Sequence, residues 1–324
     1  MSSSLGNPIQ RVVYYFSKAL RAKIDKEARR IGLFTGPTMN HVFDMEGTTG
    51  GSYGESNFDY QKLPFYQAGC FSGVAALVDQ LSRSKRVHVI DLLIRHGIQI
   101  LILMQSLASQ HGFRINHLNV TAVGTGFEEK IKQTGDRLKS FAESMHLSFS
   151  FSIVIVEDML AFIKDLLELD PREALGVYSA CGLYSLIAQQ DRLESLMKVI
   201  KSTKPRVMVV CEVAANLNSP NFLNRLIEAL FHFGAVFDAL EECEAIRSIV
   251  ATEGAERAIR HVSIDVWRKF FARFGMREIG LGMSTLYQAK LVAGKFSCGS
   301  SYMFDMDGKW KGTPIECLSA WKFA

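Results

Sequence analysis

The chain has 324 residues, of which 48% are hydrophobic, so it can bury a sizeable core. Its 37 basic and 33 acidic residues give a formal net charge of only +4, which does not by itself argue for nucleic-acid binding. The six cysteines are scattered without a CxxC pair, which indicates reduced buried thiols. No apolar run reaches the roughly 18 residues of a membrane span.

A helix is predicted to begin at Pro8, with Asn7 as its cap. Apolar side chains repeat at helical spacing along it, at Ile9, Val12, Val13, Phe16, Leu20 and Ile24. Basic residues end its polar face, at Lys23, Lys26, Arg29 and Arg30. Residues 32–60 are rich in Gly, Thr and Ser, which predicts a flexible linker.

The centre of the chain is the stretch from Ser82 to Met104. Val87–Asp91 is apolar and too short for a helix, so it is predicted to form a buried strand that ends in an acid. A turn around His96 and Gly97 follows, and Ile98–Leu107 is predicted to be a helix. Ligands of open α/β sheets bind beyond the carboxyl ends of the strands, which is where Asp91 would lie.

The remaining elements continue this alternation. Helices are predicted at 63–81, 127–146, 159–169, 193–200, 220–237 and 264–274. Strands are predicted at 116–123, 149–156, 174–180, 207–213, 289–296, 301–307 and 318–323. The last three strands follow one another without helices, which predicts an antiparallel addition at one edge of a doubly wound α/β sheet. This order resembles the methyltransferase variant of the Rossmann architecture.

The residues do not favour a cofactor or a catalytic group. The turn from Leu92 to Gly97 has one glycine and four bulky residues, where an S-adenosylmethionine site needs close approach of the backbone. Gly124-Thr125-Gly126 follows the second strand, but the first acid after it is Glu128. The histidines lie apart without HExxH spacing, and His88 inside an apolar strand is interpreted as a core histidine. No catalytic residue, cofactor or metal is therefore expected.

Several motifs resemble those of the plant GRAS family, and the resemblance covers essentially the whole chain. VHVID at 87–91 resembles the family's VHIID signature. Lys204-Pro205, the segment 231–238 and the segment 253–261 are similar to its PFYRE region, and 318–322 is similar to its SAW region. Residues 8–22 and 135–146 are similar to its two leucine-rich regions. The DELLA-like and SCARECROW-like branches are the most similar and are not separated.

The resemblance implies one GRAS domain over residues 1–324. Residues 1–31 would form a partial α-helical cap, 32–60 the flexible linker and 61–324 a Rossmann-like, methyltransferase-like α/β core. Compared with the family, the chain is expected to be truncated at its N-terminus and to have internal deletions, one of them between Glu244 and Ile246.

The resemblance also implies a function. GRAS proteins are nuclear transcriptional regulators without enzymatic activity or cofactor, and they act mainly by binding DNA-binding transcription factors in plant hormone or developmental signalling. Homodimers or heterodimers with other GRAS proteins are expected, and membrane association is not. Partner binding would use Ile9–Ile24, Ile98–Leu107 and Phe127–His146. The family-motif positions with a structural or partner-binding role are His88, Asp91, Pro205, Phe231, Arg257 and Trp321.

Two alternatives stay open. An S-adenosylmethionine-dependent small-molecule methyltransferase would need the turn from Leu92 to Gly97 to hold its cofactor. Direct sequence-specific DNA binding would use Arg83, Lys85 and Arg86, and it requires these residues and the basic end of the first helix to share one face.

Overall fold

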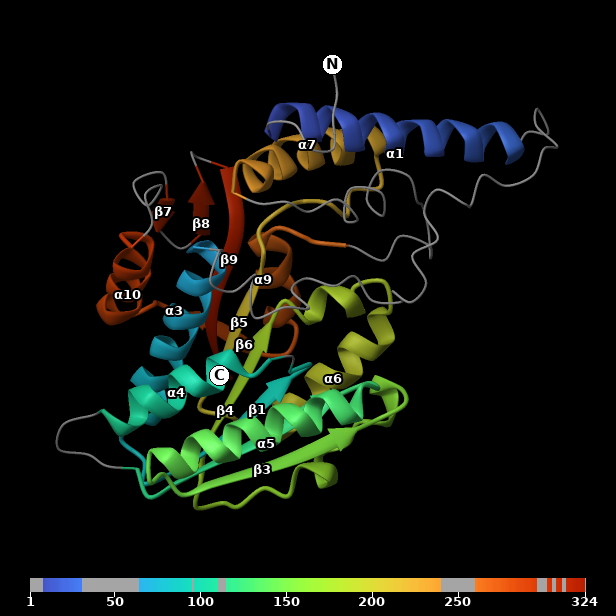
Figure 1. Cartoon of the computed structure of the whole chain (residues 1–324). Helices are drawn as coiled ribbons and strands as arrows, with labels where there is room; N and C mark the ends of the chain where they lie inside the picture. The colour runs from blue at the N-terminus through green and yellow to red at the C-terminus, as the bar shows by residue number, and fades with distance from the viewer. Residues whose placement is uncertain are drawn as a thin grey trace. The chain divides into compact units, whose positions relative to one another are not determined.

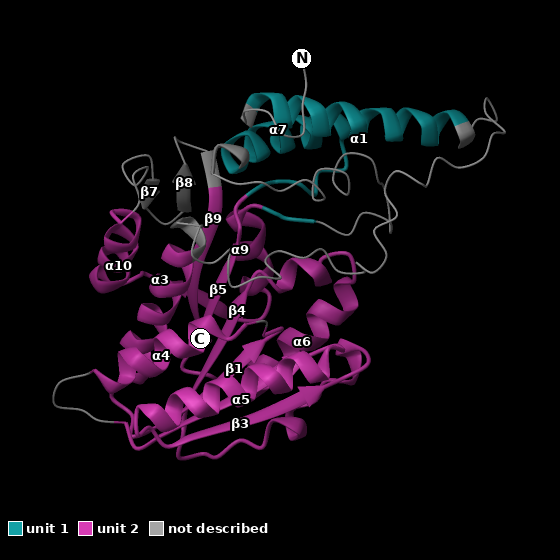
Figure 2. Cartoon of the chain, viewed as in Figure 1, with its two compact units in different colours: residues 1–63, 215–262 teal, residues 64–214, 263–324 magenta. Residues whose placement is uncertain are grey.

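The structure is a computed structural model that describes residues 8–30, 64–94, 96–109, 115–239, 260–295, 302–304, 307–310 and 313–323. The chain divides into two compact units, residues 1–63 with 215–262 and residues 64–214 with 263–324 (Figure 2). Residues 215–262 were assigned from the sequence to the α/β core, but they group with the first helix instead. The predicted linker at 32–60 and the proposed cap Asn7 lie outside the described residues.

The first unit contains α1 (Pro8–Arg30) and α7 (Phe222–Ala239), which pack against each other. Helix α1 begins at Pro8 as predicted, because proline fits the first helical turn, where its missing N–H is not needed. Phe16 and Ala19 are the buried side chains of α1. At the start of α7, the Lys23 Nζ lies 4.6 Å from the centre of the Phe222 ring.

The second unit is built on a parallel sheet (Figure 1). Its parallel strands are β1 (Arg86–Leu92), β2 (His117–Gly124), β3 (Phe149–Ile155), β4 (Ala174–Ala180) and β5 (Val207–Val213), in the order β3-β2-β1-β4-β5. The strand order reverses between β1 and β4, so this is the topological switch point of the doubly wound sheet. The predicted strands are confirmed here to within two residues, because each is a short apolar run between polar turns.

Helices α3 (Pro64–Leu81), α4 (Ile98–Ala108) and α5 (Glu128–Ser144) pack side by side as one layer, with α5 along β3 (Figure 1). Helix α6 (Gln190–Thr203) connects β4 to β5 in the reverse direction, so a right-handed crossover places it on the opposite face. The core lies between these layers, and its central strands are buried over nearly their whole length.

The predicted antiparallel addition is confirmed. Strand β9 (Thr313–Phe323) pairs antiparallel with β5, and β6 (Met276–Ile279) and β8 (Asp307–Trp310) both pair with β9. Strand β7 (Tyr302–Phe304) completes this edge beyond β8. The described residues thus form a nine-stranded sheet. Helix α9 (Ile264–Ala272) lies beside it, with the Phe271 ring 4.9 Å from that of Trp321.

Three sequence predictions are wrong in this unit. The helix expected at 159–169 is a pair of 3-10 helices, Met159–Ala161 and Lys164–Leu167, and Glu168 ends the second with a φ of 45°. The strand expected at 289–296 is the second half of helix α10 (Met283–Ala293), because a short apolar run fits both periodicities. The strand expected at 301–307 covers only β7 and the first residue of β8.

Among the described helices, none combines the length and the apolar character that crossing a membrane requires.

Candidate functional site

Asp91 lies near the carboxyl end of β1, directly at the switch point. Its backbone is paired with Ala122 of β2 on one side and Tyr178 of β4 on the other. The carboxyl group is buried and accepts a hydrogen bond of 2.7 Å from Gln99 Nε2 in the first turn of α4. Burial raises the pKa of Asp91 to about 7, although the hydrogen bond from Gln99 partly lowers it. The residue therefore ties the end of the strand to the start of the next helix.

In the turn after β1, Leu93 packs on the chain that follows β4. Leu93 adopts the left-handed conformation, with a φ of 62°, and its N–H donates to the Val123 carbonyl oxygen at 2.7 Å. A Cβ added to Gly182, just beyond β4, would lie 3.1 Å from Leu93 Cδ1 and 3.3 Å from Leu93 Cβ. Leu93 thus packs on the backbone that follows β4, in the region where sheets of this kind bind nucleotide cofactors. These residues do not fit such a cofactor.

A second acid at this edge of the sheet is Glu212, near the end of β5. Its Oε1 accepts hydrogen bonds from the backbone N–H groups of Gly182 at 3.1 Å and Leu183 at 2.9 Å, where a short 3-10 helix begins. Sequence reasoning missed this residue, although its signal was present: Glu212 is the only charged residue in the apolar strand 207–213. The carboxylate satisfies backbone donors and is not arranged as a general base.

The buried Cys211 of β5 and the partly buried Glu316 of β9 form a pair. The thiol donates a hydrogen bond of 2.7 Å to Glu316 Oε1. Burial raises the pKa of Glu316 to about 7, and burial together with the neighbouring Glu316 raises the pKa of Cys211 well above its usual value. The thiolate is therefore disfavoured, as is usual for a buried structural cysteine. Within the described part of the chain, no group of three or more histidine, cysteine or acidic side chains could hold a metal ion.

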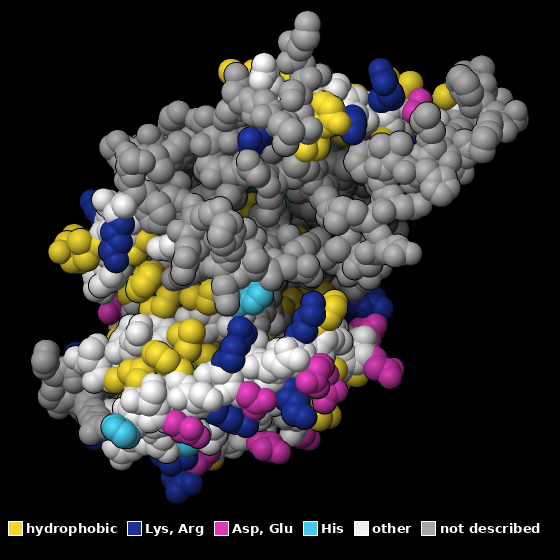
Figure 3. Space-filling view, viewed as in Figure 1, with side chains coloured by type: hydrophobic (Ala, Val, Ile, Leu, Met, Phe, Trp, Pro, Cys, Tyr) yellow, Lys and Arg dark blue, Asp and Glu magenta, His cyan; other side chains and the backbone are white. Residues whose placement is uncertain are grey.

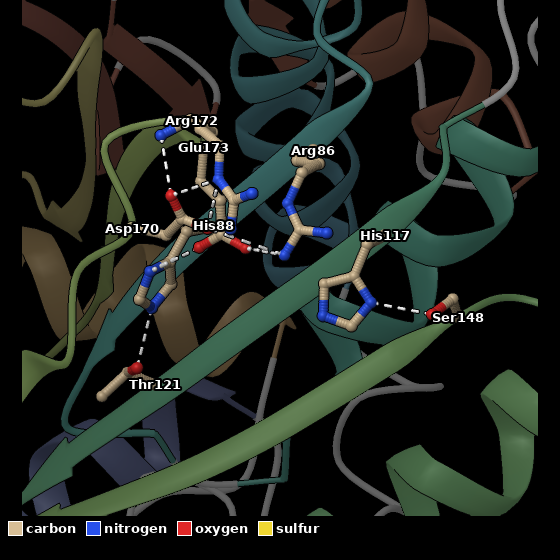
Figure 4. A network of polar contacts seen from close by, with 8 residues as sticks. All are labelled: Arg86, His88, His117, Thr121, Ser148, Asp170, Arg172 and Glu173. Carbon is tan, nitrogen blue, oxygen red and sulfur yellow. Dashed lines mark hydrogen bonds and ion pairs between the residues drawn. The ribbon is translucent and has the colours of Figure 1, made fainter.

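His88 is the centre of a polar network that crosses the sheet (Figure 4). Its Nε2 lies 2.7 Å from Thr121 Oγ1 on β2, and that hydroxyl lies 2.8 Å from Ser152 Oγ on β3. On its other side, His88 Nδ1 lies 3.3 Å from Glu173 Oε2, just before β4. Burial lowers the pKa of His88, and the nearby Glu173 carboxylate partly opposes that shift.

This series of hydroxyl, imidazole and carboxylate groups has the order of a catalytic triad, but its place in the fold gives it a different role. His88 and Thr121 are each only 1% exposed, so no substrate could reach the hydroxyl group. The network instead connects β1, β2 and β3 with the segment that leads into β4.

Arg86 joins the network through Glu173 (Figure 4), and its side chain is 39% exposed. Its Nη2 lies 3.1 Å from Glu173 Oε1 and 3.9 Å from Asp170 Oδ2. Asp170 also pairs with Arg172 at 2.7 Å, and the hydrogen bonds from Arg172 lower the pKa of Asp170 to about 2. Since Arg86 is engaged with two acids, its charge is not available in full to a phosphate.

The other residues proposed for DNA contact, Arg83 and Lys85, are exposed just before β1. They belong to the second unit, whereas the basic end of α1 belongs to the first. The arrangement of one shared basic face therefore has no support in the described structure.

The remaining family-motif residues are distributed over several elements. Pro205 is buried directly after α6, which ends at the left-handed Lys204. Trp321 is buried in β9, and its Nε1 donates to Ser319 Oγ at 2.9 Å. Phe231 is on α7 and is 68% exposed. Arg257 lies outside the described residues.

Two of the three segments expected to bind partners use their apolar side chains for the core. Helix α4 buries Ile100, Ile102, Leu103, Met104 and Leu107. The apolar face of α5 is also buried, at Ile131, Leu138 and Ala142. In contrast, large apolar side chains are exposed on α1, α7 and α10. Local apolar periodicity identifies an amphipathic helix, but it does not show whether another part of the chain covers that helix.

Comparisons with known proteins agree with this architecture. The profile of the GRAS domain family matches residues 1–322. The protein SLENDER RICE1-LIKE 1 of Oryza sativa subsp. japonica is 30% identical over 348 residues, covering 99% of this chain and 67% of that protein. The DELLA protein GAIP of Cucurbita maxima is 29% identical over 348 residues, covering 99% and 57%. The DELLA protein GAI1 of Vitis vinifera is 28% identical over 292 residues, covering 82% and 49%.

The chain thus spans about half the length of several curated relatives that it matches. Among solved structures, that of SCL7 from Oryza sativa superposes with a TM-score of 0.84 and 20% sequence identity, covering 99% of this chain and 91% of that one. At this identity the superposition shows a shared fold.

Proposed function

Because this chain belongs to the GRAS domain family, we propose that it acts in the nucleus as a transcriptional regulator that binds DNA-binding transcription factors. GRAS proteins are regulators and not enzymes, which argues against the methyltransferase alternative. The observation that supports the proposal most directly is the extent of the family match, which includes both the helical unit and the α/β core. The proposed setting is plant hormone or developmental signalling.

The packing of the core supports a role in protein binding rather than in catalysis. Leu93 packs on Gly182 at the switch point, and the acids nearby are hydrogen-bonded to the protein itself. Exposed apolar residues on helices remain as surfaces for other proteins, since grouped exposed apolar side chains mark interaction sites.

The test has two parts. First, the full chain is fused to a fluorescent protein large enough to prevent passive entry into the nucleus and is expressed in plant cells. Second, the purified chain is titrated against individually purified plant transcription factors by biolayer interferometry. We expect nuclear fluorescence and saturable binding of at least one factor, with a Kd on the order of 1 μM or lower. Exclusion from the nucleus, or no binding by a cooperatively folded chain, would contradict the proposal.

A further inference from the structure

We propose that the exposed face of α7, with the basic helix α1 packed beside it, is a docking surface for an acidic amphipathic helix of a partner protein. This inference rests on the proposed function, because it defines the kind of segment that a bound partner would present. Both helices belong to the same compact unit of the chain, coloured teal in Figure 2.

The apolar part of this surface is one side of α7. Its members are Leu223, Ile227, Leu230 and Phe231, which are 59%, 44%, 39% and 68% exposed. These positions follow the spacing i, i+4, i+7 and i+8, so they share one face of the helix. The opposite face carries the buried side chains Arg225, Ala229, His232, Phe233 and Val236. Single exposed apolar residues are common on protein surfaces, but four on two turns of one helix indicate a binding face.

Gly234 is a position without a side chain on this same face of α7. It follows Leu230 by four positions and Phe231 by three, so it lies in the same row one turn further along α7. A Cβ added to Gly234 would meet no atom within 4 Å. The row of apolar side chains is therefore followed by a position without a side chain, where an apolar group of a partner helix could be received.

The charge beside this face is positive. Helix α1 contains seven Lys and Arg residues and only two acidic residues, Asp25 and Glu27, within 23 positions. Lys23 Nζ lies 4.6 Å from the ring of Phe222, the first residue of α7, so part of this charge lies at the start of that helix. In the space-filling view, apolar and basic side chains lie next to each other over these helices (Figure 3).

This combination favours an acidic partner over a second copy of the chain. A two-fold contact through the same face would bring the basic α1 of one copy close to that of the other, and like charges held together oppose association. An acidic amphipathic helix would bury its apolar side on α7 and place carboxylates near α1. Docking of an amphipathic helix through anchors at i, i+3, i+4 and i+7 is a common mode of recognition.

The test uses the full chain and a fluorescein-labelled synthetic helix with leucines at those anchor positions and glutamates elsewhere. A second peptide carries lysines in place of the glutamates. Binding is followed by fluorescence anisotropy for the wild type and for the double variant Ile227→Ser and Phe231→Ser. The matched control is Tyr287→Ser and Leu291→Ser, which removes two exposed apolar residues, also spaced i and i+4, from α10. Circular dichroism and melting temperatures verify that every variant is folded.

We expect the wild type to bind the acidic peptide and not the basic one. The α7 variant should bind it at least about tenfold more weakly, whereas the α10 control should stay within about twofold of wild type. Lys23→Gln should weaken binding by a smaller factor and reduce its dependence on salt concentration.

Equal binding by the wild type and the α7 variant would overturn the proposal, as would equal binding of both peptides. A wild-type dimer that the α7 substitutions dissociate, observed by analytical ultracentrifugation, would assign the face to a second copy and would also overturn the proposal.

A second experiment separates this proposal from the proposed function. The α7 variant is titrated against the transcription factors that bind the wild type. Unchanged binding there would reject this surface while leaving the proposed function in place. Peptide binding as expected, without binding of any factor, would instead reject the proposed function.

Discussion

At the scale of single residues, the pKa values of two carboxyl groups are raised towards neutral pH. Asp91 and Glu316 each have a pKa of about 7, mainly because burial disfavours their charged forms. Each accepts one hydrogen bond, from Gln99 and from Cys211 respectively, and those bonds offset only part of the shift. The folded chain therefore holds protons near neutral pH that the unfolded chain releases.

Asp91→Asn tests this coupling. The pKa of Asp91 in the folded chain exceeds its ordinary value of 3.8, so its stabilising contribution is complete below that value and is lost as the pH rises through about 7. The asparagine does not titrate and still offers an oxygen to Gln99. The free energy of unfolding of the wild type, minus that of the variant, should therefore fall by on the order of 1–4 kcal/mol between about pH 5 and about pH 8.

Urea denaturation at the two pH values measures this difference. Glu316→Gln serves as a comparison, because it should remove a separate share of the same sign that belongs to strand β9. A difference between wild type and Asp91→Asn that stays constant with pH would show that the Asp91 carboxyl is ionised in the folded chain.

His88 illustrates how far sequence reasoning reaches at this scale. Its place in an apolar strand correctly indicates a buried histidine. Its partners are side chains of other elements, Thr121 on β2 and Glu173 before β4, which the sequence does not indicate. The register between parallel strands determines which side chains meet, and that register is set by packing between segments distant in the sequence.

At the scale of elements, two glycines in helix interiors have opposite environments. A Cβ at Gly135 of α5 would clash with the Phe151 ring on β3, so this glycine allows α5 to lie close to the sheet. A Cβ at Gly234 of α7 would meet no atom within 4 Å. Replacement by alanine favours any helix intrinsically, because glycine loses more conformational entropy on folding.

Gly135→Ala and Gly234→Ala should therefore change stability in opposite directions. The first should lower the free energy of unfolding by about 1–3 kcal/mol, because overpacking outweighs the gain in helix propensity. The second should leave it unchanged or raise it by up to about 1 kcal/mol. Chemical denaturation of both variants checks this. If Gly135→Ala were as stable as Gly234→Ala, the close packing of α5 on β3 would be contradicted.

The sequence predicts an element correctly when its apolar residues follow one clear periodicity. It does not do so when a short apolar run fits both a helix and a strand. Strands β4 and β5 begin and end at the predicted residues, because each is an apolar run bounded by polar turns. Helix α10 was mistaken for a strand, since its buried positions Thr285, Ala289, Val292 and Ala293 are revealed only by contact with α3. Short apolar runs fit both periodicities until a partner surface selects one.

At the scale of the whole molecule, the sheet has the topology of a cofactor-binding fold, but a leucine packs at its switch point. Leu93 packs against Gly182 there, and Asp91 is buried and hydrogen-bonded to Gln99. The prediction is that the full chain does not bind S-adenosylmethionine. Isothermal titration should give no saturable heat, and the melting temperature should not change. A ligand at 100 times its Kd would stabilise the chain by about 2.7 kcal/mol, so binding would be visible as a raised melting temperature.

An active S-adenosylmethionine-dependent methyltransferase, titrated in parallel, is the control that verifies the cofactor stock. Saturable binding by this chain, with a raised melting temperature, would show that the turn after β1 can open.

The sequence by itself determined the family, the order of the central elements and the lack of a glycine-rich turn after β1. These properties are local, because they depend on which residues are adjacent and on their periodicity. Only the tertiary structure decided that α7 joins α1 in one unit and that Leu93 packs on Gly182. It also decided that the apolar sides of α4 and α5 belong to the core, while the row of apolar side chains from Leu223 to Phe231 on α7 is exposed. Such properties depend on which distant surfaces cover one another, and burial of apolar area between segments far apart in the chain selects that arrangement.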